Sequence, residues 1–282
     1  MAVKLIIDST TDVIPELRDQ MKVVPLTIHF GEDEYLDGVT MNGQQFYEKL
    51  VESDVLPTTS QVTPYVFNQV FKEITEAGDD AVVLTISSNL SGTYQSACIA
   101  ADDYEGRVFV VDSQNVSIAA GALAAYGLRL VQSGMSAESI AKELEEKRGE
   151  VQLVAMLDTL EYLQKGGRIS KTAAIAGSLL SIKPVVTLKD GGVTVTGKAR
   201  GSRQANNMLV QGIEKVGGVD FDMPLQLGYT GLNDALLQKY IADSEKLWKG
   251  NCEDLPVALI GSVVGTYAGP GAVGVAFFPK KN

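Results

Sequence analysis

Short runs of β-branched and other apolar residues alternate with helix-like segments through the first half of this 282-residue chain. The runs cover residues 4–7, 81–86 and 107–111, and the helical segments cover residues 63–77 and a stretch that begins at Ser91. Thr63 followed by Pro64 is typical of a helix start, and Gly78 of a helix end. The alternation predicts a parallel sheet whose strands are joined by crossover helices.

The pattern changes near the middle of the chain. Helices are expected over residues 118–133 and 137–148, and a strand over residues 151–157. Asp158 and Glu161 then have the spacing of a capping box, which predicts a new helix. We expect the domain boundary here, with an N-terminal α/β domain at residues 1–157 and a C-terminal mixed α/β domain at residues 158–282.

The C-terminal half shows two further strand pairs. Residues 184–188 and 193–199 flank Asp190-Gly191-Gly192, which is a hairpin signal. Residues 257–263 and 272–277 flank a turn rich in glycine and proline. The fold class is therefore α/β with two domains, and a ligand site is expected between them.

Composition excludes several classes of partner and compartment. The formal net charge of −11 repels nucleic acid and disfavours residence on an anionic membrane, although brief contact to exchange a lipid stays open. The first residues lack the features of a signal peptide, and no apolar run is long enough to span a bilayer. Cys98 and Cys252 fit reduced thiols in a cytoplasmic protein, and their spacing supports neither zinc nor a disulfide framework.

Short hydroxyl side chains follow the predicted strands. Ser91 lies in SSNLSGTYQSA, between a strand and a helix, where it either caps the helix or helps to bind an anion. Thr59 lies in TTSQ, just before another predicted helix. Asp8 and Asp112 each end an apolar strand, and capping is the simpler interpretation of both.

Two glycine-rich segments carry side chains of different chemistry. In GGRIS, Arg168 follows two flexible residues and either anchors a phosphate or carboxylate or ties the loop to a neighbouring aspartate. In GTYAGPG, Tyr267 is a single phenol among small residues and either packs or donates a hydrogen bond.

These motifs together resemble the DegV family. The matching stretches are DSTTD, TTSQ, SSNLSGTYQSA, VVDSQ, LDTLEYLQKGGRIS and GTYAGPGAVGVAF, which occur in register along essentially the whole chain. LSGTYQSA and LEYLQKGGRIS are long enough to be specific, whereas DST or TSQ alone would not be.

The resemblance implies a fatty-acid-binding protein of the type that serves as the carrier subunit of a fatty-acid kinase. A palmitate, stearate or oleate would lie in an apolar tunnel, with its carboxylate held by the hydroxyls that match Thr59 and Ser91. Arg200, in KARGS, looks similar to a basic residue on the side that faces the head group and the kinase. The family's last loop usually reads GTHTGPG, so Tyr267 stands where a histidine usually contacts the carboxylate.

Two classes of enzyme are alternatives to a non-catalytic carrier. A serine acyl hydrolase using Ser91 would need a base, but the single histidine is His29, in a strand-like segment, and there is no G-x-S-x-G motif. A phosphoryl-transfer subunit would need a P-loop or a similar motif, which the chain lacks. No cofactor and no catalytic residue are therefore expected.

Overall fold

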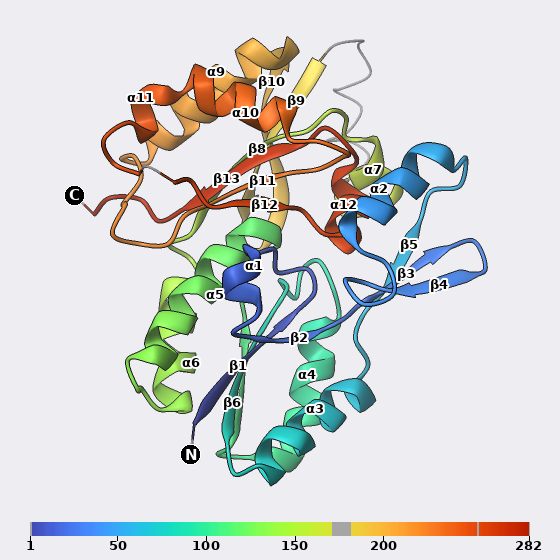
Figure 1. Ribbon diagram of the computed structural model, residues 1–282, viewed down its shortest axis with the longest axis vertical. Coiled ribbons are helices and arrows are strands. Elements are labelled where there is room, and N and C mark those ends of the chain that lie inside the picture. Colours follow the sequence, from blue (N-terminus) through green and yellow to red (C-terminus); the bar gives the residue numbers. More distant parts are fainter. Residues whose placement is uncertain (1, 171–181, 253, 282) are drawn as a thin grey trace.

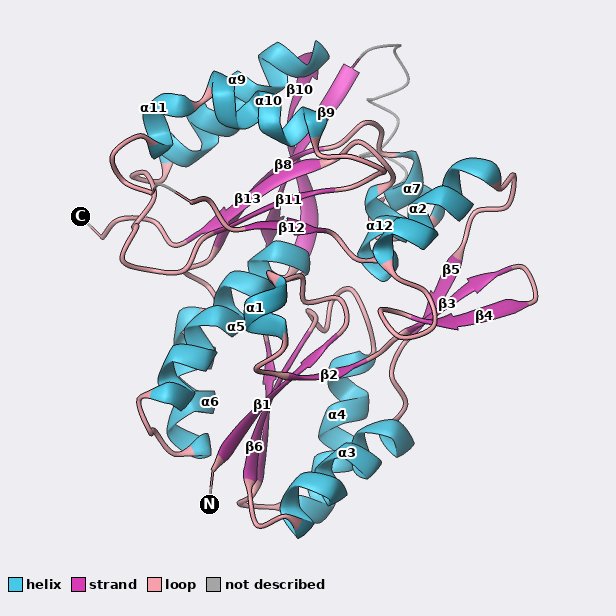
Figure 2. Ribbon diagram, viewed as in Figure 1, coloured by secondary structure: helices cyan, strands magenta, loops and turns pink. Residues whose placement is uncertain are grey.

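The computed structural model describes residues 2–170, 182–252 and 254–281. Figure 1 shows two layered bodies, one above the other, and a small antiparallel sheet beside their junction. Figure 2 shows that helices flank both larger sheets. Among the described residues, no helix is both long and apolar enough to cross a membrane.

The first sheet has four parallel strands in the order β2-β1-β6-β7. These are β1 (Val3–Asp8), β2 (Lys22–Val24), β6 (Asp80–Thr85) and β7 (Val108–Asp112). Helices lie on both faces, with α3 (Pro64–Glu76) and α4 (Thr93–Ala101) opposite α5 (Ser117–Gln132) and α6 (Ala137–Lys147). The predicted parallel sheet with crossover helices is confirmed.

The second sheet is mixed and has six strands in the order β10-β9-β8-β13-β11-β12. These are β8 (Gln152–Met156), β9 (Ile182–Lys189), β10 (Gly192–Arg200), β11 (Gln226–Tyr229), β12 (Val257–Leu259) and β13 (Val273–Phe277). Figure 1 shows the helices α9 (Gly201–Lys215), α10 (Ala235–Asp243) and α11 (Glu245–Trp248) above this sheet, and their side chains share a core with it. The predicted hairpin is present, with Asp190 and Gly191 both at positive φ.

A third sheet, β4-β3-β5, lies beside the junction. Its strands are β3 (Thr27–Phe30), β4 (Asp33–Leu36) and β5 (Thr58–Ser60). The remaining short elements are α1 (Pro15–Arg18), α2 (Gly43–Glu52), a 3₁₀ turn (Asp102–Tyr104), α7 (Glu161–Lys165) and α12 (Ser262–Ala268). Strand β3 is the strand-like segment that contains His29, whereas β4 and β5 were not predicted, because such short strands show no clear period.

Three local predictions were wrong. A boundary after residue 157 had implied that β8 belongs to the N-terminal domain. Strand β8 pairs instead with β9 and β13, so it belongs to the second sheet. The helix expected after residue 157 is present as α7, but it begins at Glu161 with Leu160 at its N-cap, so Asp158 forms no capping box and pairs with Lys183. The division into two domains itself stays a prediction.

The third wrong prediction concerns residues 257–271, which were expected to form a strand over 257–263 and then a turn. Strand β12 stops at Leu259, and helix α12 follows it from Ser262. Strands β12 and β13 do not pair with each other, since β11 lies between them.

Helix α5 connects the two large sheets. It packs on β1 of the first sheet and on β11 and β13 of the second. Most of its residues are buried and many are Ala or Gly. A helix that is apolar on all sides must be covered on all sides, so α5 serves as a shared core for both sheets.

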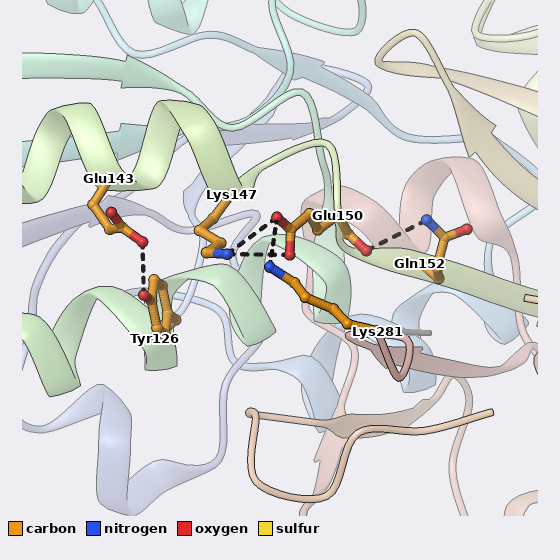
Figure 3. Close-up of polar contacts among 6 residues, drawn as sticks. All are labelled: Tyr126, Glu143, Lys147, Glu150, Gln152 and Lys281. Carbon is orange, nitrogen blue, oxygen red and sulfur yellow. Dashed lines mark hydrogen bonds and ion pairs between the residues drawn. The ribbon is translucent and has the colours of Figure 1, made fainter. Parts of the chain in front are cut away.

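A cluster of charged residues joins the C-terminus to the segment that leads into β8 (Figure 3). Lys147 Nζ donates to Glu150 Oε1 at 3.1 Å, and Lys281 Nζ reaches the same carboxylate at 3.4 Å. Burial disfavours the charged form of Glu150, but the hydrogen bonds and charges of the two lysines outweigh it and lower its pKa.

We expect Glu150→Gln to lower the free energy of unfolding near pH 7 by less than about 1 kcal/mol, because the ion pairs are partly exposed. Since the pKa of Glu150 is lowered in the folded protein, this stabilisation is present above the usual carboxyl pKa of 4.5 and is lost as the pH falls through the lowered pKa. Urea unfolding at both ends of this range measures the difference. Glu146→Gln, an exposed change on α6, is the control; equal effects of the two variants would contradict a specific role for Glu150.

Candidate functional site

A cavity lies between the two large sheets, and residues from both halves of the chain form its walls. The walls are mainly apolar and include Leu26, Ile86, Val116, Ile118, Leu153, Leu157, Leu163, Val186, Ile260 and Val263. The polar side chains that line it are Thr10, Thr59, Ser91, Ser117, Arg168, Thr187 and Tyr267. Such a cavity suits a ligand with a long hydrocarbon part and a small polar group.

Four of the five residues singled out in the sequence meet at this cavity. Thr59, on β5, and Tyr267, on α12, share a hydrogen bond of 2.7 Å between their hydroxyl oxygens. The guanidinium carbon of Arg168 lies 4.5 Å from the centroid of the Tyr267 ring. Ser91 lines the same cavity, whereas Arg200 is exposed and is not among the lining residues.

Tyr267 occupies a different backbone position from the one predicted. It lies in the last turn of α12, not in the glycine- and proline-rich turn that was expected between residues 263 and 272. Gly269 ends the helix with a φ of 68°. Its ring packs on Gly166 so closely that a Cβ there would lie 2.4 Å from the Tyr267 ring. Gly166, the first glycine of GGRIS, is therefore needed for this contact, which links α7 to α12.

Ser91 both contacts the helix start and faces the cavity. Its Oγ accepts a hydrogen bond from the Thr93 amide at 3.2 Å and lies 2.9 Å from Thr93 Oγ1. Helix α4 begins at Thr93 with Gly92 at its N-cap, so Ser91 is not the cap residue, although its Oγ accepts from the first helical amide. A hydroxyl can donate as well as accept, so this bond leaves Ser91 able to serve a ligand.

Gln61 fixes the two hydroxyl-bearing loops relative to each other. Its Nε2 donates to Ser96 Oγ at 2.9 Å, and its amide lies over Gly92, where a Cβ would come within 2.1 Å of Oε1. The TTSQ segment is thus attached to the first turn of α4, which holds Thr59 near the loop of Ser91.

Arg168 is bound by carbonyl groups, not by an aspartate. Its Nε donates to Leu90 O at 3.2 Å and its Nη1 to Gly166 O at 2.7 Å. No carboxylate of the described residues forms an ion pair with it. A guanidinium is always charged, so Arg168 brings a positive charge to the polar end of the cavity.

The strand-end aspartates hold loops in place, as the capping interpretation predicted. Asp8 Oδ2 accepts from the Ile86 amide at 2.7 Å, and burial raises the pKa of its carboxyl. Asp112 accepts from the amide and hydroxyl of Ser88 at 3.1 and 2.6 Å. Together they hold the loop between β6 and α4 at the edge of the sheet.

The apolar residues that form the cavity walls were not predicted individually from the sequence. Leu153, Ala155 and Leu157 all line the cavity and alternate along β8 and the residue that follows it. A two-residue period is the usual sign that one face of a strand is in use, and it was available in the sequence.

The single histidine, His29, does not line the cavity with Ser91 and makes its contacts elsewhere. His29 Nε2 lies 2.8 Å from Ser60 Oγ on the small sheet, and Glu34 lies 3.4 Å from its other ring nitrogen. The geometry therefore gives no support to a serine hydrolase.

The family model described as "Uncharacterised protein, DegV family" matches residues 2–280. The chain belongs to the DegV family. A DegV domain-containing protein of Clostridium acetobutylicum is 36% identical to it over 284 residues, which cover 99% of each chain. The family resemblance seen in the motifs is thus confirmed.

Solved structures share the fold over the whole chain. One, described as showing fatty acid binding of a DegV family protein from Thermus thermophilus, is 33% identical, covers 99% of this chain and 100% of that one, and has a TM-score of 0.88. Another, a DegV family protein from Eubacterium eligens loaded with heptadecanoic acid, is 25% identical, covers 99% and 100%, and has a TM-score of 0.85. The predicted DegV-like α/β fold, with a parallel sheet in one part and a mixed sheet in the other, is confirmed.

Proposed function

We propose that this protein binds one long-chain fatty acid, with the tail in the cavity and the carboxylate at Thr59, Ser91 and Tyr267. The observation that carries the proposal is that these hydroxyls and the Arg168 charge line the same, mainly apolar cavity, with Thr59 and Arg168 both in contact with Tyr267. The fatty-acid binding described for the Thermus and Eubacterium relatives supports it.

The energetics favour a long chain. Each buried methylene contributes about 0.8 kcal/mol, so some 15 of them contribute roughly 12 kcal/mol at most. Association costs about 4–15 kcal/mol, so a short acid would bind weakly. A buried carboxylate also needs donors, and hydroxyl groups beside a guanidinium supply them.

We further propose that the protein is a cytoplasmic carrier that presents its acid to a fatty-acid kinase, with transient membrane contact during lipid exchange. Its free cysteines support a reducing compartment. Arg200 is exposed at the start of α9, where its amide donates to Gln204 Oε1 at 2.6 Å. An exposed cation outside the cavity is suited to a partner, not to the buried ligand.

The first test is the content of the purified protein. Organic extraction and mass spectrometry of natively purified protein should find a free fatty acid at close to one per chain. Protein that holds no lipid, and that also fails to bind added palmitate and oleate, would contradict the proposal.

The second test removes the hydroxyls. Thr59→Ala, Ser91→Ala and Tyr267→Phe should each weaken palmitate binding by roughly 1.5–3 kcal/mol, the loss expected for one hydrogen bond to a charged group. Tyr65→Phe controls for the loss of a phenol, since Tyr65 is 72% exposed, and Ser136→Ala controls for the loss of a remote helix cap. Parental affinity in a folded triple variant would assign these hydroxyls to structure alone.

The third test separates binding from presentation. Arg200→Ala should keep parental palmitate affinity but lower the rate at which a DegV-dependent fatty-acid kinase forms acyl phosphate, by about fivefold or more if the contact resembles an interface hot spot. Lys215→Ala, an exposed cation at the far end of α9, should change neither quantity. An unchanged rate with Arg200→Ala would remove this residue from the partner surface.

A further inference from the structure

Helix α12 is held at its start by two carboxylates from the first half of the chain. The Gly261 amide donates to Asp12 Oδ1 at 2.8 Å, and the Ser262 amide donates to Asp37 Oδ1 at 3.3 Å. The same short helix carries Tyr267 in its last turn. The first and last turns of α12 are thus fixed by contacts with different parts of the N-terminal half.

The two carboxylates are themselves firmly placed. Asp12 is 5% and Asp37 4% exposed. Asp12 Oδ2 accepts from Ser117 Oγ at 2.7 Å, at the start of α5. A Cβ on Gly261 would lie 3.2 Å from Asp12 Oδ1 and 3.6 Å from Asp37 Oδ2, so both side chains lie close to this one residue.

Burying two carboxylates together is unfavourable. Desolvation raises the pKa of Asp12 to about 7 and also raises the pKa of Asp37. The charge of Asp37 adds to the rise at Asp12, whereas hydrogen bonds and Arg18 oppose the rise at both carboxyls. Asp8 and Tyr47 are the other ionisable groups that sense this cluster. A single neutral cap would satisfy one amide at a lower desolvation cost. Two carboxylates instead hold two successive amides from two directions.

The body of α12 transmits this placement to the cavity. Tyr47 Oη, on α2, donates to Ile260 O at 2.9 Å. A Cβ on Gly265 would lie 2.5 Å from Tyr47 Oη, so α12 packs tightly on α2. A helix rises about 1.5 Å per residue as a stiff unit, so a shift of its first turn also moves its last turn. The hydrogen bond between the Thr59 and Tyr267 hydroxyls tolerates a displacement of only a few tenths of an ångström.

We propose that Asp12 and Asp37 are positioning residues of the fatty-acid site, which hold α12 where the Tyr267 hydroxyl meets the ligand carboxylate. The role rests on the proposed fatty-acid binding. Neither aspartate lines the cavity, so they act through the helix and not on the ligand.

The test compares Asp12→Asn and Asp37→Asn with the parent at about pH 8.5, above the raised pKa of Asp12. Two quantities are measured on folded protein: palmitate affinity and the carboxyl ¹³C shift of bound [1-¹³C]palmitate. Each variant should bind about fivefold or more weakly, the low end of coupling between linked sites, and should move the ¹³C signal. Asn206→Ala is the control, because Asn206 is buried far from the cavity on α9, and its loss should lower stability only.

Two further variants keep the proposal testable. Gly261→Ala retains both charges and places a methyl group between the carboxylates and α12, so it should weaken binding even where an Asn variant fails to fold. In a Tyr267→Phe background, Asp37→Asn should lose most of its effect, because the hydroxyl that it positions is absent.

Parental affinity and an unchanged ¹³C shift in the Asn and Gly261→Ala variants would overturn the positioning role while leaving fatty-acid binding intact. An equal effect of Asp37→Asn with and without the Tyr267 hydroxyl would also overturn it. A parent that binds no palmitate would overturn the proposed function, and the positioning role with it.

Discussion

Helix α5 sets the distance between the two large sheets, and the site depends on that distance. A Cβ at Gly121 would lie 2.0 Å from the Asp12 carbonyl oxygen, and a Cβ at Gly228 would lie 2.7 Å from Ile118. The helix can therefore be approached closely from both sides only because small residues stand at the contacts. Its first turn begins at Ser117, which has a φ of 57°. Val116, Ser117 and Ile118, at this end of the helix, line the cavity.

The shared helix explains why the polar groups come from distant parts of the sequence. With both sheets packed on α5, the strands of the first sheet run toward the second half of the chain, where α12 contacts α7, β3 and β5. The loop after β6 carries Ser91, β5 carries Thr59, and the second half carries Arg168 and Tyr267. The polar side chains that line the cavity therefore come from both halves of the chain.

The sequence predicted those features that depend on local signals. Thr63 and Ser136 cap the helices that were expected over residues 63–77 and 137–148, and the Asp190-Gly191 turn joins the expected strands. Ser91 was singled out because it follows an apolar strand, whereas the roles given to Thr59 and Ser91 came from the family resemblance. The placement of β8 could not be predicted in the same way, because an apolar strand has the same pattern in either sheet and only its long-range partners, β9 and β13, decide between them.

Helix α12 shows the same limit at the site itself. Its sequence, rich in valine and glycine, has a low intrinsic preference for a helix, and it forms one where the Asp12 and Asp37 carboxylates accept its first amides. Both acceptors are more than 200 residues away in the chain, so no window around α12 contains the reason for its fold. Asp12 was within a recognised motif, DSTTD, but nothing in that motif indicates which amide it would meet.

The family resemblance implies that Tyr267 stands where a histidine is usual, so in the proposed site the positive charge would come from another residue. A protonated histidine at this position would itself attract a carboxylate, whereas a phenol offers only a neutral donor. In this chain the guanidinium of Arg168 lies over the Tyr267 ring, and its bonds to two backbone carbonyls leave its charge without a carboxylate partner among the described residues. In the proposed fatty-acid site the phenol would orient the ligand carboxylate, and the guanidinium that lies over its ring would supply the favourable field. Two roles that one histidine could combine would then be divided between neighbouring side chains.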